Sequence, residues 1–191
     1  MSLAKPIRVL GVVGSPRRGG NTESLVDEVL RGARDAGAAV EKVRLSELEI
    51  APCDACDTCR DAGECVLGDD MPDLLEKMAA NQVWVLGTPV YWWGPSAQFK
   101  LFMDRWYAMG GDEGYPFKGK KFGIILTYAD EDPFRSGAVN ALRTFQDAIR
   151  FLSAEITGMV YGSAWKAGEI KKNKTLLKKA YQLGKDLAAS I

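Results

Sequence analysis

Apolar and polar positions follow two periods along the chain, and together they predict repeated strand–helix units. Residues 7–14 form an apolar run, which is typical of a parallel strand buried on both faces. Residues 22–36 carry apolar side chains at helical spacing, such as Leu25 and Val29. The same reading predicts strands at 39–45, 82–88, 121–128 and 159–164, and helices that begin after Asp70 and cover 96–107, 136–152 and 171–189.

This alternation predicts one α/β domain over residues 1–191, with helices on both faces of a doubly wound parallel sheet. Five strands in the order 2-1-3-4-5 are the common solution at this size. Residues 46–69 interrupt the alternation and are expected to form an insertion. Ligands of such sheets bind beyond the carboxyl ends of the strands, where the strand order reverses. The loops after the first, third and fourth strands are therefore the candidate site.

The composition is that of an ordinary soluble domain, with 47% hydrophobic and 26% charged residues. Lys plus Arg and Asp plus Glu are equal at 25 each, so we expect no general attraction to nucleic acid or to membranes. The longest apolar runs, such as residues 83–86, are too short to span a bilayer. No signal-peptide pattern opens the chain, which predicts a cytoplasmic protein.

The loop after the first strand has the features of a phosphate site. It runs from Gly14 into a helix, so a ligand would meet the free amides and the dipole of the helix N-terminus. It lacks both the Lys-Ser/Thr pair of a Walker A loop and the Gly-x-Gly-x-x-Gly dinucleotide pattern. A cradle for a single phosphate fits best, and a polar loop with a helix cap is the alternative. The candidate donors are Ser15, Arg17, Arg18, Asn21 and Thr22.

Three adjacent aromatic residues, bracketed by Pro and Gly, follow the third strand. Such a turn is suited to support a flat ring system, although core packing or an oligomer contact would also account for it. The fourth strand ends where it would face the same cleft. A phosphate cradle beside an aromatic turn indicates a site for flavin mononucleotide (FMN). The candidate ring-binding residues are Pro89, Val90, Tyr91, Trp92, Trp93, Gly94, Thr127 and Tyr128.

All four cysteines of the chain fall within thirteen residues, and the chain has no histidine. Their spacing, C-x2-C-x2-C-x5-C, is typical of ferredoxin-like iron–sulfur ligation. Zinc and redox-active or buried thiols are the alternatives. In a reducing compartment such a cluster favours metal or redox chemistry over disulfides. The candidate ligands are Cys53, Cys56, Cys59 and Cys65.

These motifs resemble the flavodoxin-like NAD(P)H-dependent FMN reductase superfamily. The resemblance covers nearly the whole chain, and it rests on residues 14–17, 21–22 and 88–91 and on Lys100, Asp104 and Arg105. The four cysteines, followed by residues 69–71, are similar to those of the iron–sulfur flavoproteins within that group.

The resemblance implies a flavodoxin-like fold with FMN bound near residues 89–93 and Tyr128. It implies phosphate contacts from Ser15, Arg17, Asn21 and Thr22. It also implies a [4Fe–4S] cluster on the four cysteines, and homodimers or homotetramers that bring cluster and flavin of different subunits together.

We therefore expect an FMN-dependent oxidoreductase or electron-transfer protein, with a small molecule or a protein as electron donor and acceptor. NAD(P)H is a candidate co-substrate. The chemistry is expected to take place on the flavin, with no side chain acting as acid or base. One alternative is a cluster-free NAD(P)H-dependent FMN or quinone reductase. Another is a non-catalytic module whose binding loop is organised by zinc or by thiols.

Overall fold

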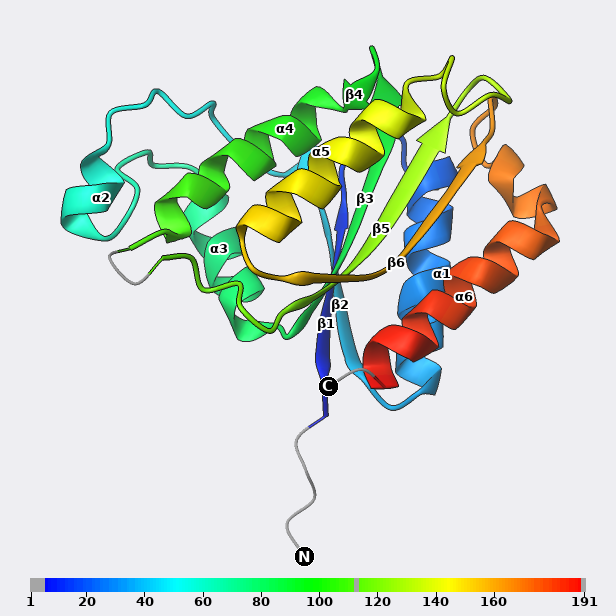
Figure 1. The fold of residues 1–191 in the computed structure, drawn as a ribbon, viewed down its shortest axis with the longest axis horizontal. Helices are drawn as coiled ribbons and strands as arrows, with labels where there is room; N and C mark the ends of the chain where they lie inside the picture. Colours follow the sequence, from blue (N-terminus) through cyan, green and yellow to red (C-terminus); the bar gives the residue numbers. More distant parts are fainter. Residues whose placement is uncertain (1–5, 112–113, 190–191) are drawn as a thin grey trace, which may run out of the picture.

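The central feature of the fold is a parallel sheet covered by helices on both faces (Figure 1). The computed structural model describes residues 6–111 and 114–189. The strands run in the order β2-β1-β3-β5-β6. This is the predicted order 2-1-3-4-5, with an additional two-residue strand, β4, paired antiparallel to β3. The strands are β1 (Arg8–Val13), β2 (Ala39–Arg44), β3 (Val83–Tyr91), β4 (Gly94–Pro95), β5 (Lys121–Tyr128) and β6 (Glu155–Ser163).

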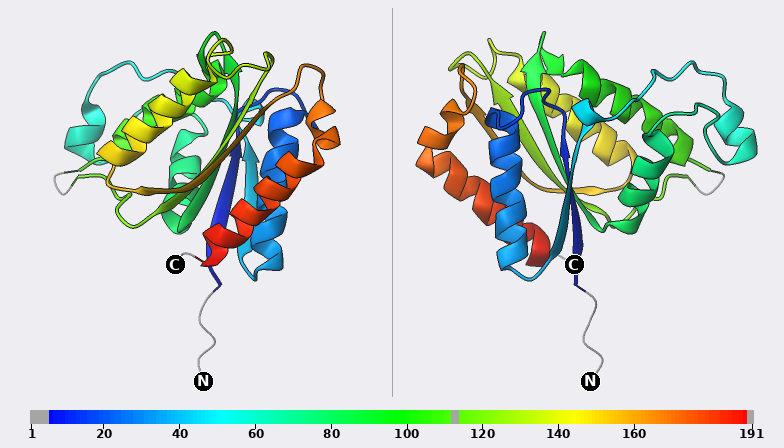
Figure 2. Two further views of the ribbon diagram at one scale, coloured as in Figure 1. Left: turned by 45° about the vertical axis from the view of Figure 1, so that its right-hand side comes forward. Right: turned by 180° about the vertical axis from the view of Figure 1, so that it is seen from behind.

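The helices form two outer layers (Figure 2). Helices α1 (Asn21–Asp35) and α6 (Lys174–Ala189) cover one face of the sheet. Helices α3 (Met71–Ala80), α4 (Ala97–Asp104) and α5 (Ala138–Phe151) cover the other. The short helices are α2 (Thr58–Ala62) and the 3-10 helices η1 (Leu45–Glu47), η2 (Arg105–Met109) and η3 (Glu169–Lys172). No helix in the described part of the chain has the length and hydrophobicity of a membrane span.

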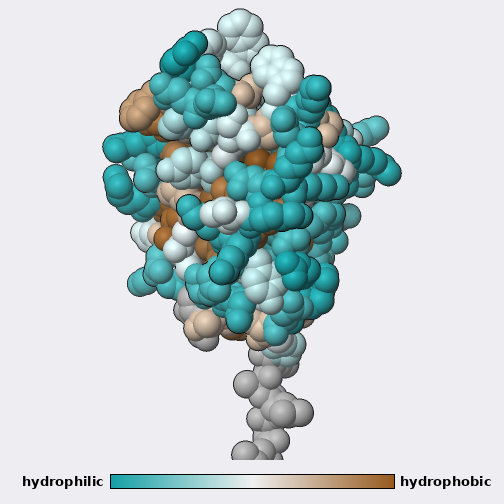
Figure 3. Space-filling model, turned by 90° about the vertical axis from the view of Figure 1, so that its right-hand side faces the viewer, coloured by the Kyte–Doolittle hydropathy of each residue, from teal (hydrophilic) through white to brown (hydrophobic). Residues whose placement is uncertain are grey.

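Each face of the sheet has its own hydrophobic core. On the α3–α4–α5 side, the fully buried Trp84 meets Phe117 and Phe122 edge-on, with ring centroids 4.8 Å apart in both pairs. On the other side, α1 and α6 approach so closely that a Cβ at Gly184 would lie 1.9 Å from the Val29 carbonyl oxygen. The outer surface of that side is largely hydrophilic (Figure 3). The two helix layers therefore pack against opposite faces of the sheet, and the loops at the carboxyl ends of the strands extend from this packed core.

Several elements differ from their predicted bounds. Strand β3 continues through Pro89 to Tyr91, because it pairs there with β4. Strand β6 begins at Glu155 rather than at residue 159. The helix predicted over 96–107 ends at Asp104 and continues as η2, and the cysteine segment contains α2.

The start of α3 is held by the two carboxylates that precede it. Asp70 is the N-cap residue, but its carboxylate accepts the Glu49 amide instead of an amide of the helix. Asp69 accepts the Met71 amide at 3.0 Å in its place. The carboxylates before α3 therefore tie the start of the helix to the beginning of residues 46–69.

Candidate functional site

A cavity of about 290 Å³ lies at the carboxyl ends of β1, β3, β5 and β6. This is the edge at which the strand order reverses between β1 and β3, as predicted. Its volume is near the lower end for small-molecule sites. The lining residues are Ser15, Arg17, Asn21, Thr22, Pro89, Val90, Tyr91, Thr127, Tyr128, Ala129, Ala164 and Trp165.

The loop between β1 and α1 forms a tight turn that leads into the first turn of α1. The Gly20 amide donates to the Arg17 carbonyl oxygen at 3.2 Å, and the Arg17 amide donates to Ser15 Oγ at 3.3 Å. Thr22 is buried, and its hydroxyl bonds the Thr127 hydroxyl at 2.7 Å. The N-terminus of α1 therefore faces the cavity with polar groups around it, as an anion site requires.

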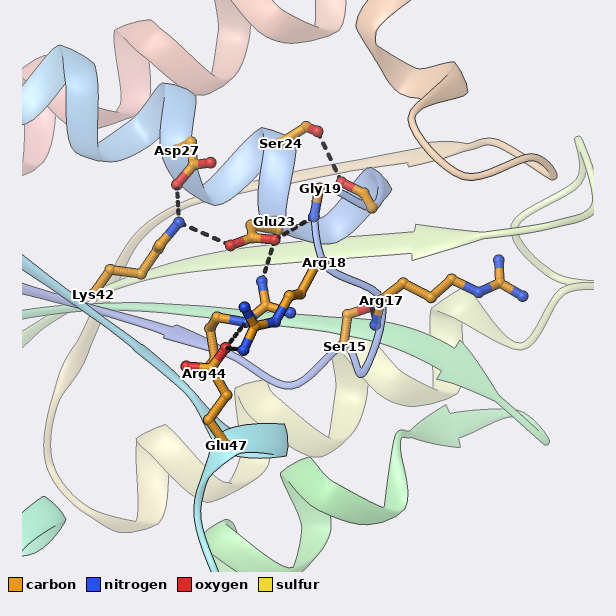
Figure 4. A network of polar contacts seen from close by, with 11 residues as sticks. Ser15, Arg17, Arg18, Gly19, Glu23, Ser24, Asp27, Lys42, Arg44 and Glu47 are labelled. Atoms are coloured by element: carbon orange, nitrogen blue, oxygen red, sulfur yellow. Dashed lines mark hydrogen bonds and ion pairs between the residues drawn. The ribbon is translucent and has the colours of Figure 1, made fainter.

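The two arginines of this loop have different roles. Arg17 lines the cavity, and Figure 4 shows its side chain pointing away from the neighbouring ion pairs. Arg18 does not line the cavity, and its guanidinium pairs with Glu47 at 2.8 Å. Among the charged side chains that the structure describes, only Arg17 belongs to this lining. The cavity therefore favours an anion such as phosphate.

A buried carboxylate holds the loop from behind (Figure 4). Glu23 accepts the Gly19 amide at 2.6 Å and is paired with Lys42 at 2.8 Å and with Arg44. Burial by itself would raise the pKa of Glu23, but the hydrogen bonds from Arg44, Lys42 and Gly19 outweigh it and lower the pKa to about 2. Glu23 is thus ionised at neutral pH, and the two cations balance its charge beside the proposed anion site.

The aromatic turn after β3 is a two-residue hairpin loop. Trp92 and Trp93 both have positive φ, at 47° and 62°, between the paired residues of β3 and β4. Trp93 lies against Gly137, where a Cβ would come within 2.4 Å of it. The described lining of the cavity includes Tyr91 but not Trp92, Trp93 or Gly94. Whether these three residues contact the flavin ring stays a prediction.

The opposite wall comes from the end of β5. Thr127 and Tyr128 both line the cavity, as predicted, and both are buried. Burial raises the pKa of Tyr128, and Tyr161 and Asp132 raise it further. The phenol therefore stays protonated at neutral pH and can donate a hydrogen bond into the cavity.

Ala164 and Trp165, which follow β6, also line the cavity and were missed in the sequence. The Ala164 amide donates to the Tyr128 carbonyl oxygen at 2.8 Å, and the Asn21 side chain bonds the backbone of residues 164–170. Asn21 and its partners are 143 to 149 residues apart in the chain, so no local pattern could have revealed them.

The four cysteines lie away from this cavity, in the segment around α2, and line a separate small cavity of about 20 Å³. Cys53 and Cys56 are exposed, Cys59 is buried and Cys65 is half-buried. Burial raises the pKa of Cys59, and Cys65 raises it further. Within the described residues, no three His, Cys, Asp or Glu side chains are arranged to hold a metal ion.

Arg105 joins the cysteine segment to the rest of the molecule. Its guanidinium is almost fully buried and donates to both carboxylate oxygens of Asp69, at 2.5 and 3.2 Å. It also donates to the Ala51 carbonyl oxygen at 3.0 Å and to Cys65 Sγ at 3.2 Å. A buried cation is thus placed beside Cys65, one of the candidate ligands.

Residues 7–161 match the NADPH-dependent FMN reductase family. A protein from Methanocaldococcus jannaschii named iron-sulfur flavoprotein is 33% identical over 139 residues, which are 73% of this chain and 71% of that protein. An Archaeoglobus fulgidus protein with the same name is 37% identical over 123 residues, which are 64% of this chain but only 55% of that protein.

A solved structure with a similar fold supports the family match. Megasphaera elsdenii flavodoxin superposes with a TM-score of 0.59 over 95% of this chain and 98% of its own, at 19% identity. That likeness shows the fold, which is flavodoxin-like as expected. The family match shows more, since it covers most of the chain. The chain belongs to the NADPH-dependent FMN reductase family, and it is an FMN-dependent oxidoreductase.

Proposed function

We propose that the cavity above β1, β3, β5 and β6 is the FMN site, with the phosphate at the N-terminus of α1. The observation that carries this proposal is the lining itself, in which Arg17 and the first turn of α1 lie at one end and Tyr91 and Tyr128 supply aromatic rings. Ser15 and Thr22 add hydroxyl groups to the lining. Such a set fits an anionic phosphate joined to a flat ring system.

Bound FMN supplies hydride and one-electron chemistry, and the side chains bind and orient it. The described lining of the cavity has no carboxylate, lysine or thiol, and the chain has no histidine. The protonated Tyr128 can donate a hydrogen bond there. The protein thus contributes binding, orientation and a wall against water rather than an acid–base pair.

NAD(P)H is the proposed electron donor, supported by the family to which the chain belongs. The electron acceptor is proposed to be a small molecule or a protein. Anaerobic mixing of the flavin-loaded protein with NADH or NADPH should bleach the flavin absorption band. If neither nucleotide reduces the flavin while dithionite does, the donor assignment is wrong and a protein donor takes its place.

A [4Fe–4S] cluster on the four cysteines is the second cofactor proposed. Its support is the thiol chemistry of one shared cavity, the guanidinium beside Cys65 and the names of two relatives. Anaerobic reconstitution with iron and sulfide should give about four irons per chain. Cys56→Ser should lose the iron and keep the flavin. Absence of iron after reconstitution would instead favour the cluster-free FMN or quinone reductase, as the described side chains form no ready metal site.

The proposed assembly is a homodimer or a homotetramer. Trp92, Phe134 and Trp165 are each more than 70% exposed on the loops around the cavity, which is unusual for large aromatic side chains. The cysteine segment around α2 also lies on a different side of the molecule from the start of α1 (Figures 1 and 2), so a second subunit would bring the two centres together. A monomer by light scattering of the loaded protein would contradict this.

A flavin titration tests the main proposal. Protein stripped of flavin should bind FMN with one site per chain, and the flavin fluorescence should change as it binds. Failure of folded, stripped protein to bind FMN would overturn the assignment of the cavity.

A further inference from the structure

Asn21 uses its whole side-chain amide on backbone groups of a distant segment. Its Nδ2 donates to the carbonyl oxygens of Ala164 and Lys166, at 3.3 and 2.9 Å. Its Oδ1 accepts the Ile170 amide at 3.1 Å. An asparagine amide has two N–H donors, so both are committed. No side-chain donor of Asn21 is left for a phosphate, although the residue stands at the position where a phosphate contact was predicted.

The segment that Asn21 holds is the connection between β6 and η3, which passes beside the start of α1 (Figure 2). Within this connection, the Glu169 carboxylate accepts hydrogen bonds from the amides of Trp165 and Lys166, at 2.8 and 2.9 Å. The connection is therefore a compact unit. The bonds from Asn21 join that unit to the first turn of α1.

This attachment determines one wall of the cavity. Ala164 and Trp165 line the cavity, yet Trp165 is 74% exposed and little of its side chain is packed. The backbone bonds of the connection, rather than burial of the indole, must then keep these residues in place. Two of those bonds end on the carbonyl oxygens on either side of Trp165.

We propose that Asn21 is a positioning residue, which latches residues 164–170 against α1 so that they form the wall of the flavin site. The inference rests on the proposed FMN site and deepens it. Arg17, Ser15 and the amides of α1 then serve the phosphate. Asn21 then affects the affinity for FMN and for riboflavin alike, because it positions residues 164–170 without contacting the phosphate.

Riboflavin separates this role from a phosphate contact, because it is FMN without the phosphate. Affinities of stripped protein for FMN and for riboflavin are measured by fluorescence titration for the wild type, Asn21→Ala and Arg17→Ala. Loss of the latch should weaken both ligands by a similar factor, about tenfold for a lost set of hydrogen bonds. Arg17→Ala is the matched control for a lost phosphate contact, and it should weaken FMN alone.

Hydrogen exchange of the ligand-free protein gives a second readout. In Asn21→Ala, the Ile170 amide loses its acceptor and should exchange about tenfold faster or more. If Asn21→Ala weakens FMN but not riboflavin, or if exchange of the Ile170 amide stays unchanged, the latch is disproved. Should Asn21→Ala fail to fold, Asn21→Ser carries the same comparison, because the shorter side chain cannot span to both carbonyl groups.

The two proposals fail in different ways. If the wild type binds neither flavin, the FMN site is wrong, while the exchange measurement still decides whether Asn21 holds the connection. If the wild type binds both flavins and the exchange does not change in the variant, only the latch is wrong.

Discussion

At the scale of single residues, a side chain that already bonds another part of the protein is less available to bind a ligand. Arg17 and Arg18 are neighbours of the same type, but Arg18 is paired with Glu47 while Arg17 lines the cavity. Asn21 and Thr22 are also neighbours, but Asn21 bonds a distant backbone segment while Thr22 bonds Thr127. Contacts of this kind reduce the set of side chains that we propose as phosphate ligands.

The arginine pair gives a matched test of the phosphate site. Arg17→Ala should weaken FMN binding about tenfold, because a charge-assisted hydrogen bond to phosphate contributes about 1.5 kcal/mol or more. Arg18→Ala removes the same charge from the same loop but breaks only an exposed ion pair. Its FMN affinity should stay within about twofold of the wild type. Equal losses in the two variants, measured by fluorescence titration, would contradict the assignment.

Glu23 predicts a dependence of stability on acid. Its folded pKa of about 2 lies below the ordinary value of 4.5, so its contribution is complete above pH 4.5 and is lost as the pH falls toward 2. The difference corresponds to a contribution on the order of 3 kcal/mol. Free energies of unfolding between pH 7 and pH 3 should fall less steeply for Glu23→Gln than for the wild type. Parallel pH profiles would show that Glu23 does not carry this contribution.

Sequence reasoning identified nine of the residues that line the cavity, because loops after parallel strands must meet at one edge: Ser15, Arg17, Asn21, Thr22, Pro89, Val90, Tyr91, Thr127 and Tyr128. It could not foresee that Arg18 would find Glu47, or that Asn21 would bond the backbone on either side of Trp165. Those outcomes depend on contacts between segments far apart in the chain. Lys100 and Asp104, four residues apart on α4, form an ion pair at 2.6 Å, as their helical spacing allows.

At the scale of elements, the β3–β4 hairpin departs most from local preferences. Two-residue hairpins with positive φ at both central positions favour Asn and Gly, yet this one has two tryptophans. Residues 89–95 contain Pro, Gly and three aromatic residues, a composition that indicates a turn. The strand was therefore predicted to end at residue 88, whereas β3 continues to Tyr91. Strand β6 was predicted too short for a related reason, since residues 155–158 include a charged residue and a glycine and form no apolar run.

Backbone strain in this hairpin can be measured. Trp92 has φ of 47° and is 91% exposed, so Trp92→Asn removes little packing and places a residue that tolerates positive φ. It should raise the free energy of unfolding by about 1 kcal/mol. Trp92→Val is the control, because a β-branched side chain is poorly suited to positive φ, and it should lower stability. Denaturant unfolding of both variants would contradict the account if Trp92→Asn were no more stable than Trp92→Val.

At the scale of the whole molecule, two chemically different regions share one fold. The carboxyl edge of the sheet carries the cavity proposed for the flavin, and the segment between β2 and α3 carries the cysteines. Arg105 holds that segment through Asp69, Ala51 and Cys65, and Tyr107 adds a hydrogen bond to Asp57 at 2.9 Å. The cysteine segment is thus attached to η2 rather than to the strands that form the flavin site.

Replacing Arg105 should destabilise the molecule strongly. Arg105→Met leaves the carboxylate of Asp69 buried without its cation, at a cost of about 3–5 kcal/mol. Lys100→Met is the matched control, because it breaks an exposed pair nearby and should cost no more than about 1 kcal/mol. Guanidinium unfolding of the two variants measures the difference. Equal costs would mean that the buried pair does not hold the cysteine segment as described.

A crystal structure of the protein grown with FMN tests the central claim most directly. The account predicts that the phosphate lies within hydrogen-bond distance of the first amides of α1 and of the Arg17 side chain, with the ring system beside Tyr91 and Tyr128. Asn21 should still bond the backbone of residues 164–170. Flavin bound elsewhere on the molecule, or phosphate held away from α1, would contradict it.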